Sequence, residues 1–246
     1  MTATTHEPQG RLVDKHVHHR DIQGGWLRPA VFGAMDGLVS NVSLVSGVAG
    51  ADAPSRFVLL AGLAGLVAGS FSMAVGEYNS VRSQQELALA ELELERREIT
   101  RAPKAEEAEL AEMYAARGLS RDLAKAVAKE FSRDPDVAWR VHAREELGVD
   151  PDQLPSPWTA GIASFVSFAC GAVVPLLPYL FGMRSGALLL ACALSGFALF
   201  GVGALVSRFT NRSWIYAGMR QLVLGACAAI ITYAVGAVIG VGAGTA

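Results

Sequence analysis

The sequence has few charged residues for its length. Only 18% of its 246 residues are Asp, Glu, Lys or Arg, whereas soluble domains carry about a quarter. Hydrophobic residues make up 52% of the chain, and 26 residues are glycine. This composition excludes an ordinary soluble domain and favours an integral membrane protein.

Cysteine is also scarce. Cys170, Cys192 and Cys227 lie in apolar runs without CxxC spacing, which argues against a disulfide framework or a thiolate metal site and favours buried small side chains. No GxxxxGK[ST] phosphate loop is present, so a built-in ATPase is not expected. We expect no nucleic-acid partner.

Acidic residues are almost absent from the apolar segments. Asp36 and Glu77 are the two that fall inside them, and no acid follows Asp152. An ionisable group in hydrocarbon costs at least about 3 kcal/mol and usually marks a path for an ion or a proton. Because both groups are acidic, they indicate that the ion on such a path is a cation.

Five stretches have the roughly 20 mainly apolar residues that a span requires. They cover about residues 27–50, 56–80, 158–182, 186–207 and 215–242. The polar N-terminus lacks the order of a secretory signal, so the first stretch should remain as an anchor. His6, His16, His18 and His19 in that terminus are either a solvated tail or an accessory metal trap.

Basic residues predict the orientation of these spans. A cytoplasmic N-terminus places the charged segment 82–152 and the loop with Arg208 and Arg212 on the same side, as the positive-inside rule prefers. Trp26, Trp158 and Trp214 then stand at the cytoplasmic starts of three spans, where amphipathic rings are favoured.

Residues three or four apart share a face of a helix, and two such faces are polar. Gly65, Gly69, Met73 and Glu77 share a face of the second span, and Asp36, Ser40, Ser43 and Gly47 share one on the first, beside Asn41. These faces are either the lining of an ion path or a packed polar seam. Arg220 in the fifth span either reaches the membrane surface or pairs with one of the acids.

The segment 82–152 holds 17 of the 23 acids. No proline lies between Pro54 and Pro103, and no glycine between Gly76 and Gly118, so the second span should continue as one helix to about residue 100. Further helical patterns follow Pro103. The sequence thus predicts an all-α membrane protein of five transmembrane helices, divided as 1–26 (tail), 27–81, 82–153 (cytoplasmic helical insert) and 154–246.

The acids of the insert recur at helical spacing. Glu95 and Glu98, like Glu106 and Glu109, lie three apart, so each pair can present its oxygens to one cation, and a turn at Pro103 can bring the pairs together. Oxygen ligands with an occasional imidazole suit Mn²⁺, Fe²⁺ and Zn²⁺. By spacing alone, a solvated charged face remains the alternative.

Several motifs in order resemble those of the vacuolar iron transporter family. They are FGAMDGLVSN, GSFSMAVGEYNS, ERREI followed by ExxE, EMYAARGLS, REELGVD and RQLVLGACAAIITYAVG, and the resemblance covers about residues 28–242. It implies a homodimer of five-helix protomers that moves Fe²⁺, and in some members Mn²⁺, out of the cytosol in exchange for protons.

The resemblance also implies roles for residues. Asp36 and Met73 would lie on the translocation path with Glu77 near its cytoplasmic mouth, and Glu95, Glu98, Glu106 and Glu109 would be ligands in the insert. In the last insert helix, His142 stands where eukaryotic members have methionine, Ala143 replaces an acid, and Glu146 matches the final acid. One ligand is therefore missing or supplied by Glu145.

The resulting hypothesis is a secondary transporter that exports Fe²⁺ or Mn²⁺ against protons, with Zn²⁺ as a further ion for the insert. A membrane-tethered di-iron oxidase or metal-storage protein is the alternative from another class, because His142 and Glu145 have ferritin-like spacing in reverse order. A passive divalent-cation channel is a third. Composition favours a prokaryotic member in a plasma (inner) membrane.

Overall fold

The computed structural model describes residues 25–210 and 212–243, and this part of the chain contains helices and no strand. The N-terminal histidines lie outside these residues. The elements are α1 (Leu27–Gly50), α2 (Ser55–Arg101), α3 (Pro103–Ala116), α4 (Arg121–Phe131), α5 (Pro135–Glu145), α6 (Pro157–Val173), the short 3-10 turn η1 (Val174–Leu176), α7 (Leu177–Leu180), α8 (Ala187–Thr210) and α9 (Trp214–Ala243). The all-α prediction is confirmed.

Five helical segments among the described residues are long and apolar enough to cross a membrane. They are α1, the apolar part of α2, the run from α6 through α7, α8 and α9, and they agree with the five apolar stretches of the sequence. The α6–α7 run is interrupted by η1 near Pro175 and Pro178, because proline has no N–H to continue the helical hydrogen bonds.

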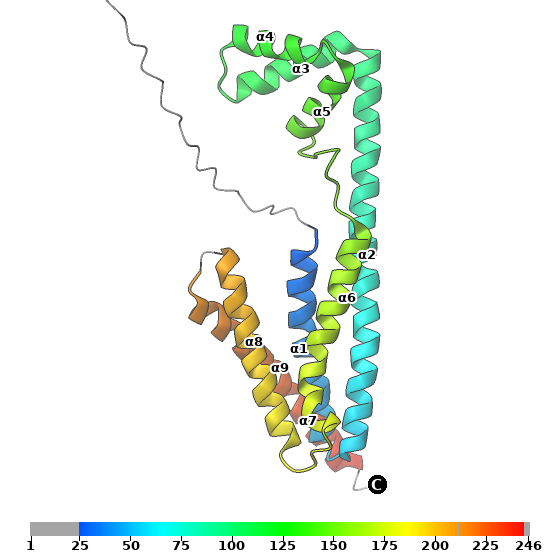
Figure 1. Ribbon diagram of the computed structural model, residues 1–246, viewed down its shortest axis with the longest axis vertical. Helices are drawn as coiled ribbons and strands as arrows, with labels where there is room; N and C mark the ends of the chain where they lie inside the picture. The colour runs from blue at the N-terminus through cyan, green and yellow to red at the C-terminus, as the bar shows by residue number, and fades with distance from the viewer. Residues whose placement is uncertain (1–24, 211, 244–246) are drawn as a thin grey trace, which may run out of the picture.

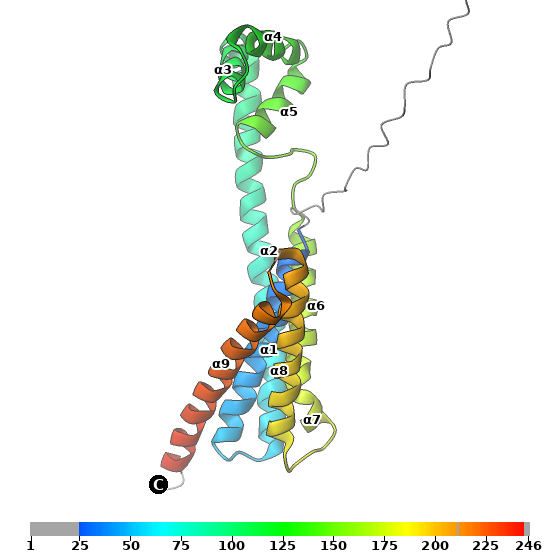
Figure 2. The ribbon, with the colours of Figure 1, turned by 90° about the vertical axis from the view of Figure 1, so that its left-hand side faces the viewer.

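Helix α1 lies at the centre of the apolar bundle and contacts α2, α6, α8 and α9 (Figures 1 and 2). Its contact with α6 is close because Gly37 has no side chain. A Cβ atom at this position would overlap the carbonyl oxygen of Phe168. Leu38, Val42 and Val45 fill the space between the helices with side chains that are at most 3% exposed. Helix α9 crosses α1 and diverges from α2 and α6 (Figure 2).

Helix α2 is much longer than a membrane is thick. Its 47 residues give about 70 Å at 1.5 Å per residue, against about 30 Å of hydrocarbon. One half packs in the bundle and the other projects beyond it, carrying α3, α4 and α5 at its far end (Figure 1). The long helix that the missing prolines and glycines predict is therefore present, and it ends at Arg101, before Pro103.

The three short helices form a small packed unit on this projecting arm. Leu110 and Ala111 of α3 pack against Ala128 of α4. Helix α5 is fixed to α2 by Trp139, whose indole N–H donates to the Leu92 carbonyl oxygen at 2.9 Å. The Arg96 guanidinium lies 5.4 Å from the centre of the Trp139 ring, a cation–π contact. These contacts set the position of α5 relative to the acids of α2.

Candidate metal sites

Three potential ligands meet where α5 lies against α2. Glu95 of α2, His142 of α5 and Glu146 after it offer ligand atoms that all lie within 4.8 Å of one another. The His142 Nδ1 atom is 3.0 Å from Glu95 Oε1 and 3.7 Å from Glu146 Oε2. Glu106 of α3 adds a fourth, with Oε2 3.9 Å from the same nitrogen. Three helices thus contribute donors to one point.

The inner part of this cluster is buried without hydrogen bonds. The His142 side chain is 0% exposed and that of Glu95 is 4% exposed. Neither ring nitrogen of His142 nor Oε1 of Glu95 has a hydrogen-bond partner among the described residues, although Nδ1 and Oε1 lie 3.0 Å apart. Buried polar atoms without partners are costly, and a cation between them would remove that cost.

Repulsion among the acids is the second unusual property of the cluster. Burial, followed by the charges of Glu146, Glu106, Glu98 and Glu109, raises the pKa of Glu95 to about 7. Burial also raises the pKa of Glu106, with further contributions from Glu109, Glu98 and Glu146. The acids of both sequence-predicted ExxE pairs are therefore close enough to repel one another, and Glu98 and Glu109 lie on the exposed side of the cluster.

By sequence, Glu145 is a candidate replacement for a missing ligand, but its side chain points away from the donor cluster. Its carboxylate forms an ion pair with Arg117 and accepts a hydrogen bond from the Tyr114 hydroxyl at 3.2 Å. Arg117 also donates to the backbone carbonyl oxygen of Glu145 at 3.1 Å. The residue next to Glu146 on a helix points about 100° away, so Glu145 is directed toward α3 and outside the donor cluster.

A second polar site lies within the apolar bundle. A cavity of about 210 Å³ between α1, α2 and α6 is lined by Asp36, Ser40, Asn41, Leu44, Gly65, Gly69, Ser72, Met73 and Phe168. The Ser40 hydroxyl donates to Asp36 Oδ1 at 2.6 Å. Asn41 donates to the Ala172 carbonyl at 2.5 Å, while its own side-chain oxygen is buried without a partner. Carboxylate, hydroxyl, amide and thioether groups thus surround one space.

Four of the five predicted path residues line this cavity, and Glu77 does not. Glu77 is partly buried on α2, one helical turn from Met73 in the direction of the projecting arm. Arg220 is exposed on α9 and forms no ion pair with Asp36 or Glu77 within the described part of the chain. The described residues therefore show no ion pair in which Arg220 neutralises one of these acids.

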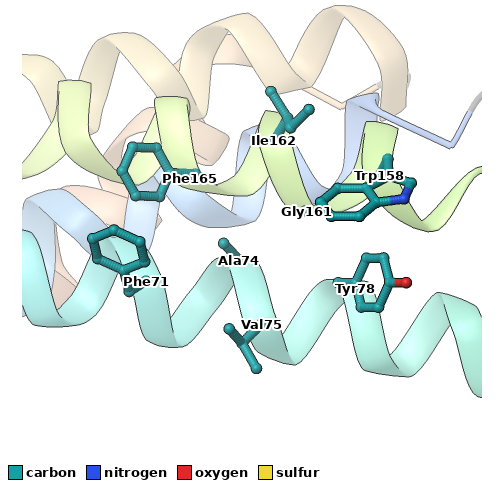
Figure 3. A pocket seen from close by; sticks show the side chains of 8 residues that line it. All are labelled: Phe71, Ala74, Val75, Tyr78, Trp158, Gly161, Ile162 and Phe165. Carbon is teal, nitrogen blue, oxygen red and sulfur yellow. The ribbon is translucent and has the colours of Figure 1, made fainter.

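Another hollow between α2 and α6 has no metal donor. Figure 3 shows it between two aromatic pairs, Phe71 with Phe165 and Tyr78 with Trp158, whose ring centres are 5.2 and 4.9 Å apart. Ala74 and Gly161 lie between the two pairs. No carboxylate, imidazole or thiol lines this space, so it is not a cation site.

Sequence reasoning missed the contribution of α6 to the membrane cavity. Phe168 closes the cavity against Gly69, where a Cβ atom would overlap the phenyl ring, and Ala172 binds the Asn41 amide. Neither residue carries chemistry that a motif could identify. The available signal was glycine spacing, since Gly65 and Gly69 mark where a neighbouring side chain approaches α2.

Comparison with known proteins identifies the family. The model of the VIT family matches residues 27–237. A protein named vacuolar iron transporter from Acanthamoeba castellanii is 38% identical over 233 residues, which cover 91% of this chain and 83% of the relative. Vacuolar iron transporter 1 from Oryza sativa subsp. japonica is 31% identical over 231 residues, covering 90% and 92%.

A third relative, vacuolar iron transporter 1 from Tulipa gesneriana, is 28% identical over 222 residues, covering 90% of this chain and 88% of the relative. These relatives come from plants and an amoeba and carry vacuolar names, so they give no support to the expectation of a prokaryotic plasma-membrane protein. The match nevertheless includes both the bundle and the projecting arm with its acids. The chain belongs to the VIT family.

Proposed function

We propose that the protein is a secondary transporter that moves Fe²⁺ or Mn²⁺ out of the cytosol in exchange for protons. The observation that carries this proposal is the cavity within the apolar bundle, where Asp36, Asn41 and Met73 face one space. A carboxylate in such surroundings is expensive unless it serves an ion or a proton. The relatives named vacuolar iron transporter support iron as a cargo. The protein is not an enzyme, because its family consists of transporters.

The cluster on the arm is proposed to capture the metal first. Its ligand set is Glu95, Glu98, Glu106, Glu109, His142 and Glu146. Carboxylates with one imidazole suit Fe²⁺, Mn²⁺ and Zn²⁺, and disfavour Cu(I). Fe²⁺ and Mn²⁺ are the proposed transported ions, and Zn²⁺ is proposed as an ion that binds the insert.

The proposed exchange follows from the chemistry of carboxylates. A ligand oxygen must be deprotonated to hold a metal, so protons and metal compete for the same site. A proton that arrives from the far side would displace the ion bound at Asp36, and an ion from the cytosol would displace that proton. Such a cycle requires no nucleotide.

We further propose that two copies of the chain form the working unit. Phe32, Asp36, Ser40 and Leu44 follow one another at intervals of four along α1, and Phe32, Ser40 and Leu44 are exposed in the single chain. Lipid is a poor neighbour for the Asp36 carboxylate. A second copy laid against this stripe would cover it and bring two Asp36 side chains to one path.

The proposed arrangement in the membrane has five spans with a cytoplasmic N-terminus and a cytoplasmic insert at 82–153, following a tail at 1–26 and the spans of 27–81 and preceding those of 154–246. The insert and the α8–α9 loop then share the side that holds most of the Arg and Lys residues. The plasma (inner) membrane, which the composition favours, is the proposed location.

Transport into sealed proteoliposomes tests the exchange. We expect Mn²⁺ uptake to accelerate when the lumen is made more acidic than the outside and to slow when the gradient is collapsed by a proton carrier. A matching alkalinisation of the lumen should accompany uptake. Uptake at one unchanged rate under both conditions would overturn the exchange and support the passive channel instead.

A further inference from the structure

The end of α8 and the start of α9 enclose a polar hollow away from both metal sites. Its volume is about 800 Å³, and Ser207, Arg208, Arg212, Ser213 and Trp214 contribute to its lining. It differs from the cation cavity near Asp36 in having two guanidinium groups and no carboxylate. A site of this charge repels metal ions and attracts anions.

The two arginines have no countercharge of their own. Both are exposed, and neither forms an ion pair in the part of the chain that the structure describes. The sequence contains no acid after Asp152, so this half of the chain cannot neutralise them locally. The short helices α3, α4 and α5 of the arm lie apart from this end of α8 in both views (Figures 1 and 2). The described residues therefore offer no countercharge to this hollow, and it can accept an anion from its surroundings.

The position of the hollow indicates which anion. The end of α8 and the start of α9, whose residues line the hollow, lie at the end of the bundle from which the arm projects, near the level at which α1 and α6 begin (Figure 1). Trp214 is 57% exposed there, and Trp26 and Trp158 are 56% and 68% exposed at the starts of α1 and α6. Exposed tryptophans on apolar helices gather at the headgroup level of a bilayer. Because Arg208 and Arg212 line the same hollow as Trp214, we expect their guanidinium groups at the depth of lipid phosphates.

We propose that the hollow between α8 and α9 binds the phosphate of an anionic phospholipid in the leaflet on the side of the arm. Arg208 and Arg212 supply the planar donors that suit phosphate oxygens, and the Ser213 hydroxyl offers a further donor. The acyl chains then run along the apolar surfaces of α8 and α9. This inference is independent of the transported ion.

Native mass spectrometry of the full-length protein tests the proposal. Protein released from nanodiscs that contain equal amounts of phosphatidylglycerol and phosphatidylcholine should retain phosphatidylglycerol preferentially. Each juxtamembrane arginine is worth about 1 kcal/mol toward anionic lipid, which is roughly five-fold in binding. The Arg208→Gln/Arg212→Gln variant should therefore lose the preference, while Arg208→Lys/Arg212→Lys should retain part of it.

Arg184→Gln is the matched control, because Arg184 is exposed in the α7–α8 loop at the opposite end of the bundle. The preference should remain unchanged in this variant. The proposal is wrong if the wild-type protein shows no preference for phosphatidylglycerol, or if Arg184→Gln loses as much as the double variant. The wild-type measurement decides the first point even if the double glutamine variant does not fold.

A second experiment distinguishes a bound lipid from bound soluble phosphate. In detergent, phosphatidylglycerol should raise the melting temperature of the wild-type protein more than that of Arg208→Gln/Arg212→Gln. Inorganic phosphate at matched ionic strength should give no such difference. If inorganic phosphate stabilises the wild-type protein as strongly as the lipid and fails to stabilise the variant, the site takes free phosphate and the lipid assignment is overturned.

Discussion

The two acidic sites of this protein differ in how densely they are charged. In the membrane cavity, one carboxylate, Asp36, shares its space with a hydroxyl, an amide and a thioether. On the arm, Glu95 is surrounded by four further acids that raise its pKa, together with a buried imidazole. Dense charge makes a strong cation site in water, whereas hydrocarbon makes each additional charge expensive.

This contrast suggests a division of labour between capture and passage. A site with many oxygen ligands holds a divalent ion tightly and releases it slowly. A site with one carboxylate and neutral ligands holds the ion weakly enough to let it leave. The two sites can therefore be separated by experiment, since damage to one should leave the other intact.

The largest effect is expected from Asp36→Asn. This change removes the carboxylate that lines the membrane cavity while keeping its size, so Mn²⁺ transport in proteoliposomes should fall to the level of protein-free vesicles. Calorimetric Mn²⁺ binding to the arm should be unchanged. The control is Asp52→Asn, in the exposed turn between α1 and α2, which should transport normally. Wild-type flux in Asp36→Asn would remove the cavity from the path.

Glu95→Gln should instead weaken Mn²⁺ binding to the arm. Loss of a group that supports a metal ligand already costs about 10–100-fold in affinity, so loss of the ligand itself should weaken Mn²⁺ binding to the detergent-solubilised protein by at least that much. Glu93→Gln on the same helix is the control, because Glu93 is exposed and paired with Arg97. Equal losses in the two variants would show that general charge, and not this cluster, attracts the metal.

The pH dependence of the arm should have opposite signs with and without metal. Because the pKa of Glu95 is raised to about 7 from 4.5, the folded protein binds more protons than the unfolded chain between those values. Without metal, this group therefore makes the protein most stable below about pH 4.5, and that contribution is lost as the pH rises toward 7.

Mn²⁺ affinity should instead fall by about ten-fold per pH unit below pH 7, since a ligand must lose its proton. Melting curves and calorimetry at pH 5, 6, 7 and 8 check both signs. The Glu95→Gln variant should lack the corresponding part of each slope. Affinity that is constant from pH 5 to 8 in the wild-type protein would contradict the placement of Glu95 in the site.

The smallest effect is expected from Glu145→Gln. The structure pairs this carboxylate with Arg117 and Tyr114 and directs it away from the cluster, so Mn²⁺ affinity should change by no more than about two-fold. The lost ion pair is partly exposed and should cost about 1 kcal/mol or less in unfolding free energy. A ten-fold loss of affinity at an unchanged melting temperature would return Glu145 to the ligand set.

Much of the fold was predictable because its signals are local. Apolar length gives the five long segments, and the absence of proline and glycine between Gly76 and Pro103 gives the continuous helix α2. The spacing of Glu95 with Glu98 and of Glu106 with Glu109 placed each pair on one helix face. Local periodicity could not say whether two such faces meet, because that depends on the turn at Pro103 and on how α5 packs.

The sequence by itself determined which groups are candidates for metal chemistry: Asp36 in an apolar stretch, the paired acids after Glu91, and a histidine in the last helix of the insert. Only the tertiary structure decided which of these side chains lie close together. Trp139 fixes α5 against α2, and this contact places His142 next to Glu95. The ion pair with Arg117 directs Glu145 away from them. The reason is physical: a helix fixes the direction of each side chain, whereas the packing between helices fixes which directions converge.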